Sequence, residues 1–205
     1  MQIAGRCDET VRAADTTMAT TRHSGFTLIE LMIALSIFAF LLLIAGPQYA
    51  DLMGNMQIRN GAENTLMGVR VAQGEAVRSN SQSQFILDPT PCSGGWQVKR
   101  LNNETGVFDV VQSYTFADGA CKTTPSANPS GATEVTFNGL GRVIPNADAT
   151  NTLLWIEVTN TNVSSGPRNL RVVINPLTPS GIKLCDPDPR VASNDPSDPR
   201  ICPAT

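Results

Sequence analysis

One carboxylate stands alone in the most apolar part of this sequence. Glu30 lies within the segment 26–45, in which no other acidic or basic side chain occurs. An acidic side chain inside a membrane-spanning helix costs about 2.5–3.5 kcal/mol, and such residues usually have a function. Glu30 lies only about one helical turn inside the start of the segment, so its carboxylate could also simply reach the lipid headgroups. A functional role and plain solvation are therefore both open.

The other residue types offer little for catalysis. The only histidine, His23, precedes the apolar segment, which excludes Ser–His–Asp and Cys–His catalysis and imidazole metal sites from the rest of the chain. No acid–base pair or activated nucleophile is recognisable, so we expect no enzyme activity and no cofactor. Four aspartates near the C-terminus could bind calcium, but each precedes a proline, which favours solvated turns and no metal site. They are Asp186, Asp188, Asp195 and Asp198.

The cysteines predict disulfides rather than a metal or redox centre. Cys7 precedes the apolar segment, four cysteines follow it, and none stands in a Cys-x-x-Cys pair. An even number of cysteines outside the cytoplasm is typical of disulfides, and four cysteines allow three pairings. We favour Cys92–Cys121 and Cys185–Cys202, because each would close a local loop rich in Gly, Pro, Ser and Asp.

The apolar segment has the length of a transmembrane helix, since about 20 apolar residues cross a bilayer. We expect this helix over residues 26–47. A secretory signal peptide would have a shorter, uncharged apolar region and a clear small-residue cleavage site, whereas only a weak site occurs near Ala45. Gly46 and Pro47 are expected to break the helix, because proline removes a backbone hydrogen bond. The basic flank at Arg22 and His23 directs the C-terminal part outward.

The remaining chain predicts an α+β protein. Residues 48–82 show apolar side chains at helical spacing, and residues 83–205 predict a β-rich domain that includes a C-terminal loop at 185–202. No helical pattern separates the predicted strands, which favours antiparallel sheet packed on the long helix over an α/β fold. Residues 122–133 and 160–169 have loop composition. Strands are expected at 84–87, 96–101, 107–116, 134–137, 153–159, 170–174 and 181–185.

Three stretches together resemble a known family. GFTLIEL, at residues 25–31, resembles the processing site of type IV pilins and pseudopilins. GVRVAQGEAVRSNSQSQFILD (68–88) and EVTFNGLGRVIP (134–145) resemble the GspH/FimT group of minor pilins and pseudopilins. The resemblance implies a pilin-like fold, cleavage by a prepilin peptidase between Gly25 and Phe26, and methylation of the Phe26 amine. It also implies that Glu30 pairs with the terminal amine of a neighbouring subunit.

Residues 1–25 are then a prepilin leader. Leaders of this family are short, and a start at Met18 would give a conventional one. Residues 1–17, which contain Cys7, are therefore interpreted as the product of a mis-assigned start codon or as part of the segment removed by cleavage.

The resemblance implies a minor type IV pilin held in the inner membrane by a single helix, with its head domain in the periplasm. It would then join other pilin subunits in a hetero-oligomeric helical filament outside the cell, supporting adhesion, twitching or DNA uptake. A type II secretion pseudopilin is the first alternative, because it shares the helix and the fold. The two predicted disulfides favour the pilus, in which disulfide-bonded C-terminal regions are usual.

A DNA-binding minor pilin that acts as a receptor in natural transformation is the second alternative. Some members of the group bind DNA through a Gly-Arg-x-Arg motif, and at the equivalent place this chain has Gly181-Ile182-Lys183-Leu184. The formal net charge is −3, and aspartates are interspersed among the cations near the C-terminus, so DNA binding is not favoured. Arg142, in the turn NGLGR, is assigned no function. The cations are Arg168, Arg171, Lys183, Arg190 and Arg200.

Overall fold

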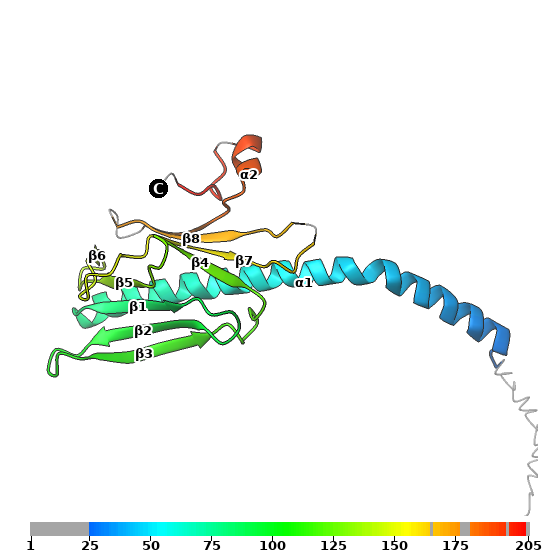
Figure 1. Ribbon diagram of the computed structural model, residues 1–205, viewed down its shortest axis with the longest axis horizontal. Coiled ribbons are helices and arrows are strands. Elements are labelled where there is room, and N and C mark those ends of the chain that lie inside the picture. The colour runs from blue at the N-terminus through cyan, green and yellow to red at the C-terminus, as the bar shows by residue number, and fades with distance from the viewer. Residues whose placement is uncertain (1–24, 165, 177–180, 196, 204–205) are drawn as a thin grey trace, which may run out of the picture. The chain divides into compact units, whose positions relative to one another are not determined.

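The computed structural model describes residues 25–164, 166–176, 181–195 and 197–203. The predicted leader, including Cys7, lies outside these residues. The described chain forms two compact units, one ending at Leu42 and the other beginning at Leu43. The second unit is the head domain, and it contains all the β-structure (Figure 1).

Helix α1 runs from Leu28 to Ser79 and has recognisable signals at both ends. Thr27 caps its start, because the Thr27 hydroxyl oxygen accepts a hydrogen bond from the backbone N–H of Glu30 at 3.2 Å. At its end, Asn80 adopts a positive φ of 46°, and the N–H of Ser81 donates to the carbonyl of Ala76 at 3.2 Å. This is a Schellman-type stop, in which asparagine replaces the usual glycine.

The helical state continues through Gly46 and Pro47, where the sequence predicts a kink or local melting within one long helix. No single helix of the described residues is both long and apolar enough to cross a membrane. The segments Leu28–Ile44 and Gln48–Ser79 meet that requirement by length and composition only when they are taken together across residues 45–47.

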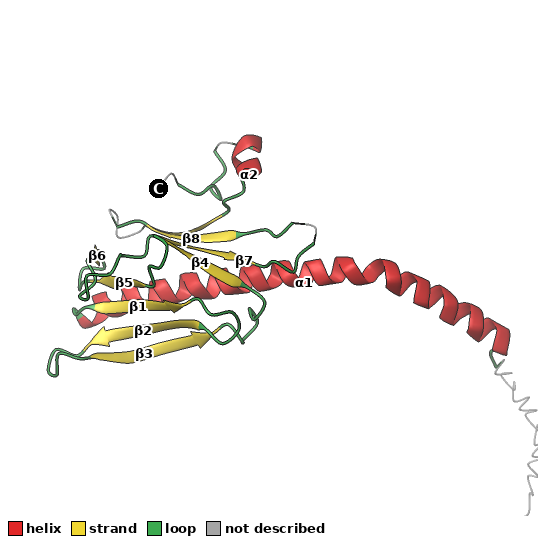
Figure 2. Ribbon diagram, in the orientation of Figure 1, coloured by secondary structure: helices red, strands yellow, loops and turns green. Residues whose placement is uncertain are grey.

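The head contains two antiparallel sheets (Figure 2), which agrees with the antiparallel pairing that the sequence predicts. The first sheet has the order β3-β2-β1-β5-β6, and the second has the order β4-β7-β8-β9. The strands of the first are β1 Ser83–Asp88, β2 Gly95–Leu101, β3 Phe108–Thr115, β5 Glu134–Phe137 and β6 Val143–Ile144. Those of the second are β4 Thr124–Asn128, β7 Trp155–Thr159, β8 Leu170–Ile174 and β9 Ile182–Cys185.

The core lies between one face of α1 and the two sheets. Small side chains dominate the buried helix face, and branched or aromatic side chains from the strands pack against it. This arrangement confirms the predicted α+β fold, with the long helix carrying an antiparallel β head. The buried helix residues are Ile58, Ala62, Val69, Ala72 and Ala76, and the largest buried strand residues include Phe85, Phe137 and Ile156.

Two elements correct the sequence prediction. Strand β4 lies inside 122–133, which was expected to be a loop, and it pairs with β7 at the edge of the second sheet. An edge strand tolerates a proline such as Pro125, which lacks the N–H that an interior strand must donate. Helix α2, Pro189–Asn194, replaces part of the turns expected near the C-terminus. Asp188 caps it by accepting from the N–H of Arg190, and Pro189 occupies its first turn.

A buried carboxylate joins α1 to the first sheet. Glu75 has a side chain that is only 9% exposed, and it pairs with Arg78 on the helix at 2.7 Å and with Arg100 on β2 at 3.0 Å. The hydrogen bonds from Arg78, followed by its charge and by the contacts with Arg100, lower the pKa of the Glu75 carboxyl. A carboxylate charge at this depth requires such partners, so the triad fixes the position of the sheet on the helix.

Candidate functional site

The predicted processing site lies in an open, non-helical segment. Residues 25–27 precede the first turn of α1, and the Phe26 side chain is 84% exposed. A peptide bond can enter a protease only where its backbone is accessible and not held in a helix. The bond between Gly25 and Phe26 meets both conditions.

Glu30 occupies the third helical position, so Thr27 and Glu30 form the Thr-x-x-Glu pattern of a capping box. Its backbone N–H is satisfied by the Thr27 hydroxyl, and its side chain is exposed. A carboxylate in the first turn is also favoured by the helix dipole. The carboxylate makes no hydrogen bond or ion pair with another described residue and is accessible from outside the chain. Thr27 was not singled out from the sequence, although the capping-box spacing could have revealed it.

The helix beyond Glu30 presents apolar side chains in all directions. Every large apolar side chain from Leu28 to Ile44 is at least half exposed, from 54% at Ile33 to 78% at Leu43. The one hydroxyl in this stretch, that of Ser36, donates to the carbonyl of Ile33 at 2.8 Å, so its polarity is satisfied within the helix. A continuous apolar surface of this kind must be covered by lipid or by other proteins.

Both disulfides close loops of the head. Cys92 is bonded to Cys121, and Cys185 is bonded to Cys202, which are the two pairings that the sequence favours. The first bond joins the β1–β2 loop to the segment before β4. The second joins the end of β9 to the C-terminal segment, which is also held by a hydrogen bond from the Asp186 N–H to the Arg200 carbonyl at 2.7 Å.

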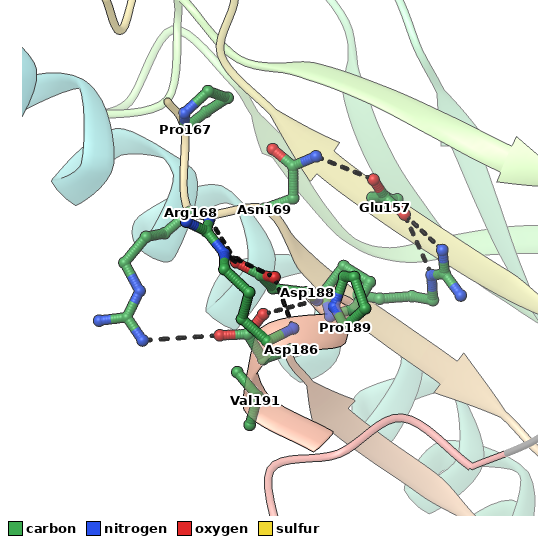
Figure 3. A pocket seen from close by; sticks show the side chains of 11 residues that line it. Glu157, Pro167, Arg168, Asn169, Asp186, Asp188, Pro189 and Val191 are labelled. Atoms are coloured by element: carbon green, nitrogen blue, oxygen red, sulfur yellow. Dashed lines mark hydrogen bonds and ion pairs between the residues drawn. The ribbon is translucent and has the colours of Figure 1, made fainter. Parts of the chain in front are cut away.

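A polar hollow lies between β8 and α2, and its charges are paired within the chain (Figure 3). Arg171 donates to Glu157 at 2.6 Å, and Asn169 donates to the same carboxylate at 3.0 Å. Asp186, whose side chain is only 7% exposed, lies 3.5 Å from the Arg168 guanidinium. The hollow thus has charged walls but little uncompensated charge.

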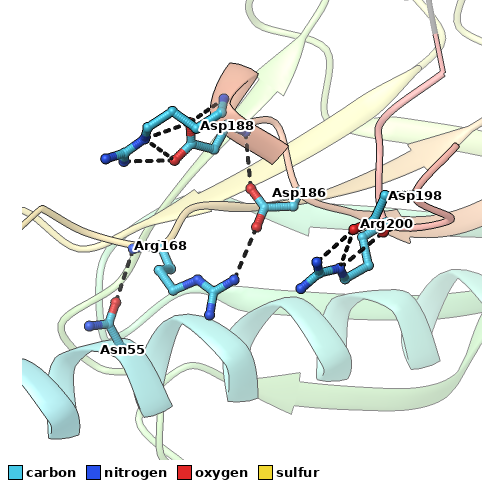
Figure 4. Close-up of polar contacts among 7 residues, drawn as sticks. Asn55, Arg168, Asp186, Asp188, Asp198 and Arg200 are labelled. Carbon is cyan, nitrogen blue, oxygen red and sulfur yellow. Dashed lines mark hydrogen bonds and ion pairs between the residues drawn. The ribbon is translucent and has the colours of Figure 1, made fainter. Parts of the chain in front are cut away.

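The two Asp-Pro-Arg repeats fold into two similar ion pairs (Figure 4). Asp188 binds the guanidinium of Arg190 at 2.7 Å, and Asp198 binds that of Arg200 at 2.6 Å. Hydrogen bonds from Arg200 lower the pKa of the Asp198 carboxyl to about 2. Each pair is local, because proline holds the aspartate in extended backbone and directs the arginine back towards it.

The basic side chains that were considered for DNA binding are therefore largely paired with acidic side chains. Most of the aspartates that were considered for calcium binding take part in these pairs. Lys183 donates to the Ile201 carbonyl at 3.1 Å, and Asp195 accepts from the backbone and hydroxyl of Ser197. Within the described residues, no three His, Cys, Asp or Glu side chains group closely enough to hold a metal ion. The pairing of Arg168 with Asp186 could not have been foreseen, because it depends on how β8 and β9 meet.

The loop between β7 and β8 docks on the helix. The N–H and hydroxyl of Ser164 donate to Asp51, and the N–H of Arg168 donates to the Asn55 side chain at 3.0 Å (Figure 4). These bonds hold one rim of the second sheet on the first turns of α1 in the head.

Two family models match parts of this chain. A family model of the prokaryotic N-terminal methylation motif matches residues 20–46, and one described as type II transport protein GspH matches residues 61–178. Among solved structures, the type IV minor pilin FimU of Pseudomonas aeruginosa (strain PAO1) is similar at a TM-score of 0.40 and 15% identity, over 62% of this chain and 92% of that one. Comparison with curated proteins gave no match. The methylation motif implies a membrane-anchored N-terminal helix, processing by a prepilin peptidase and assembly with other pilins.

Proposed function

The chain belongs to the GspH family, and from this premise we propose that it is a minor type IV pilin. Pilins are structural subunits. The observation that carries the proposal is the order of features at the N-terminus. An accessible Gly25-Phe26 bond, a carboxylate at Glu30 and an exposed apolar helix follow one another within the methylation motif.

Maturation begins with cleavage between Gly25 and Phe26 on the cytoplasmic face of the inner membrane. The new Phe26 amine is then methylated. Because Phe26 becomes the first residue, Glu30 becomes the fifth residue of the mature chain. The amine is a cation at neutral pH, so one mature chain carries a positive group and a negative group within its first two helical turns.

Glu30 docks the subunit onto a neighbour by binding that neighbour's terminal amine. Each charge alone is costly in the apolar interior of a membrane or filament, and pairing reduces the cost for both. Only one relative position of two helices brings carboxylate and amine together, so the pair also sets the stagger between subunits. The apolar surface from Leu28 to Ile44 packs in the filament core.

The head lies in the periplasm before assembly and outside the cell afterwards. Two disulfides are consistent with an oxidising compartment. Gly46 and Pro47 supply a weak point at which the helix can adapt when the subunit leaves the membrane. The role is to help initiate or cap a pilus together with other minor subunits.

A type II secretion pseudopilin is the second candidate, and the description of the matched family favours it. Deleting the gene separates the two machines. Loss of surface pili with normal protein secretion supports the pilus, and the reverse result supports the secretion system. DNA binding is less favoured, because the cations of the C-terminal segment are occupied by aspartates and a carbonyl.

The docking role is tested by replacing Glu30→Ala in cells that assemble the filament. We expect near-normal cleavage and methylation but at least a tenfold drop in the amount of the subunit in sheared filaments. Asp118→Ala removes one exposed carboxylate from the head, outside both the docking site and the sheet edges, and serves as the matched control, with normal incorporation expected. Normal incorporation of the Glu30→Ala chain would contradict the proposal.

A further inference from the structure

The exposed apolar side chains of the head gather at opposite edges of the first sheet. Among the described residues after residue 60, the large exposed ones are Met67, Val77, Val107, Val110, Val111 and Leu140. The three later valines lie on β3 or just before it, at one edge. Leu140 lies in the turn that joins β5 to β6, at the other edge. Apolar side chains exposed in groups usually mark contact surfaces.

The edge at β3 carries negative charge, and we call it the acidic edge. It consists of Val107, Val110 and Val111, which are 59%, 58% and 42% exposed, with Glu104 and Asp109 beside them. Neither carboxylate makes an ion pair with any described residue. In the strand pairing Arg100 of β2 lies opposite Asp109, but its guanidinium is paired with Glu75, and Lys99 lies opposite Val110.

The opposite edge carries positive charge, and we call it the basic edge. Leu140, 72% exposed, and Val77, 53% exposed, line one shallow hollow together with Arg70 of α1. Arg142 follows in the same turn, and Arg70 and Arg142 have no ion-pair partner among the residues that the structure describes. A hydrogen bond of 2.9 Å from the Gln73 amide to the Gly141 carbonyl holds the turn against the helix.

The two edges are complementary, since each combines exposed apolar side chains with unpaired charge and the signs are opposite. The chain as a whole has a formal net charge of only −3, so the separation of charge is local. A surface that is complementary to a different surface of the same molecule makes a head-to-tail contact between copies, and such a contact can repeat without closing. Complementary charge also selects the partner and its orientation.

We propose that the basic edge of one copy binds the acidic edge of a second copy. In this contact Leu140 and Val77 pack on the valines of β3, while Arg70 and Arg142 face Glu104 and Asp109. The inference goes beyond the proposed function, because it concerns the head alone and requires only two copies in one membrane or micelle. It can therefore fail while the docking role of Glu30 holds.

The test is photo-crosslinking of the purified full-length protein in detergent micelles. Leu140 is replaced by p-benzoylphenylalanine, and Ser126, an exposed residue of β4 in the other sheet, carries the same probe as a control. The expected result is a dimer product from the Leu140 probe, with the label on a peptide that contains residues 104–111 of the second copy. The Ser126 probe should give at least tenfold less dimer.

Charge reversal sharpens the test. Arg70→Glu with Arg142→Glu should lower the dimer yield at least tenfold. Adding Glu104→Lys and Asp109→Lys to the same chain reverses both edges and should restore it, which a merely misfolded chain would not do. The proposal is overturned if no dimer forms or if the label lies elsewhere in the second copy. It is also overturned if the dimer yield does not change on charge reversal, or if the fourfold variant does not regain the parent's dimer yield. With DNA added, labelling of DNA in place of the second copy would also overturn it.

Discussion

Trp96 of β2 lies directly against Gly68 of α1. A Cβ atom on Gly68 would stand 2.7 Å from two atoms of the indole and 2.9 Å from the ring of Phe85. Such distances are shorter than real carbon contacts, so the first sheet can lie this close to the helix only where residue 68 has no side chain. The pair joins the long helix to the aromatic core, in which Trp96 also stacks near Tyr114 at 5.9 Å between ring centroids.

Gly68→Ala should therefore destabilise the head by about 1–3 kcal/mol, the usual cost of overpacking a core. Gly74→Ala is the matched control in the same helix, because no atom lies within 4 Å of its added Cβ. Alanine favours the helix by up to about 1 kcal/mol over glycine, so this variant should be neutral or more stable. Urea unfolding in detergent, followed by tryptophan fluorescence, gives both values. Equal effects of the two substitutions would contradict the packing.

Glu134 should make the head more stable as the pH falls. Burial is the main cause that raises the pKa of its carboxyl above 4.5, with a smaller contribution from the charge of Asp148. A carboxyl whose pKa is higher in the folded state holds its proton more tightly there. Its contribution to stability is complete below the unfolded-state pKa and is lost as the pH rises through the folded-state pKa.

Glu134→Gln keeps an oxygen to accept the hydrogen bonds that Gln84 and Thr136 donate, at 2.7 and 3.2 Å, and removes the half-buried charge. The variant should be more stable than the parent at pH 7, and this difference in stability should narrow as the pH falls through the folded-state pKa of Glu134 and be smallest below 4.5. Free energies of unfolding measured at pH 7 and pH 4 check this. A gap that widens on acidification would refute it.

The Cys185–Cys202 bond should govern the protection of the C-terminal segment. The bond spans 17 residues, and loop closure of that length is worth about 3 kcal/mol. Replacing both cysteines by serine should expose Arg190 and Arg200 to trypsin, with cleavage at least tenfold faster than in the parent. The Cys92→Ser/Cys121→Ser chain is the control, and its C-terminal segment should stay resistant. Equal resistance in both variants would show that the hydrogen bonds of the segment suffice.

The strands that the sequence predicts well are those with dense β-branched and aromatic residues between clear turn signals. Residues 134–137 and 170–174 coincide with β5 and β8. Strand β4 reads TPSAN and has no such composition, because an edge strand is stabilised by its pairing with β7 rather than by its own residues. The capping signal of α2 is present in Asp188-Pro189, but six residues are too few to show a helical period.

The candidate site also has features that could be predicted from the sequence and features that could not. The methylation motif is local in sequence, so Gly25, Phe26 and Glu30 could be chosen directly, and the GspH family suggested by residues 68–88 and 134–145 is confirmed by the match over 61–178. Contacts between residues that are far apart in the sequence could not be predicted. The Glu75–Arg100 pair and the two complementary edges depend on the register and order of the strands, which no local pattern specifies.

The most direct test of the account is the intact mass and N-terminal sequence of the membrane-extracted protein, with and without reduction. We expect a chain that begins at Phe26 and carries one methyl group on its amine. Before reduction it should be lighter by four hydrogen atoms, two for each disulfide. A chain that begins at Met1 or Met18, or that is cut near Ala45, would contradict prepilin processing and with it the assignment of Glu30.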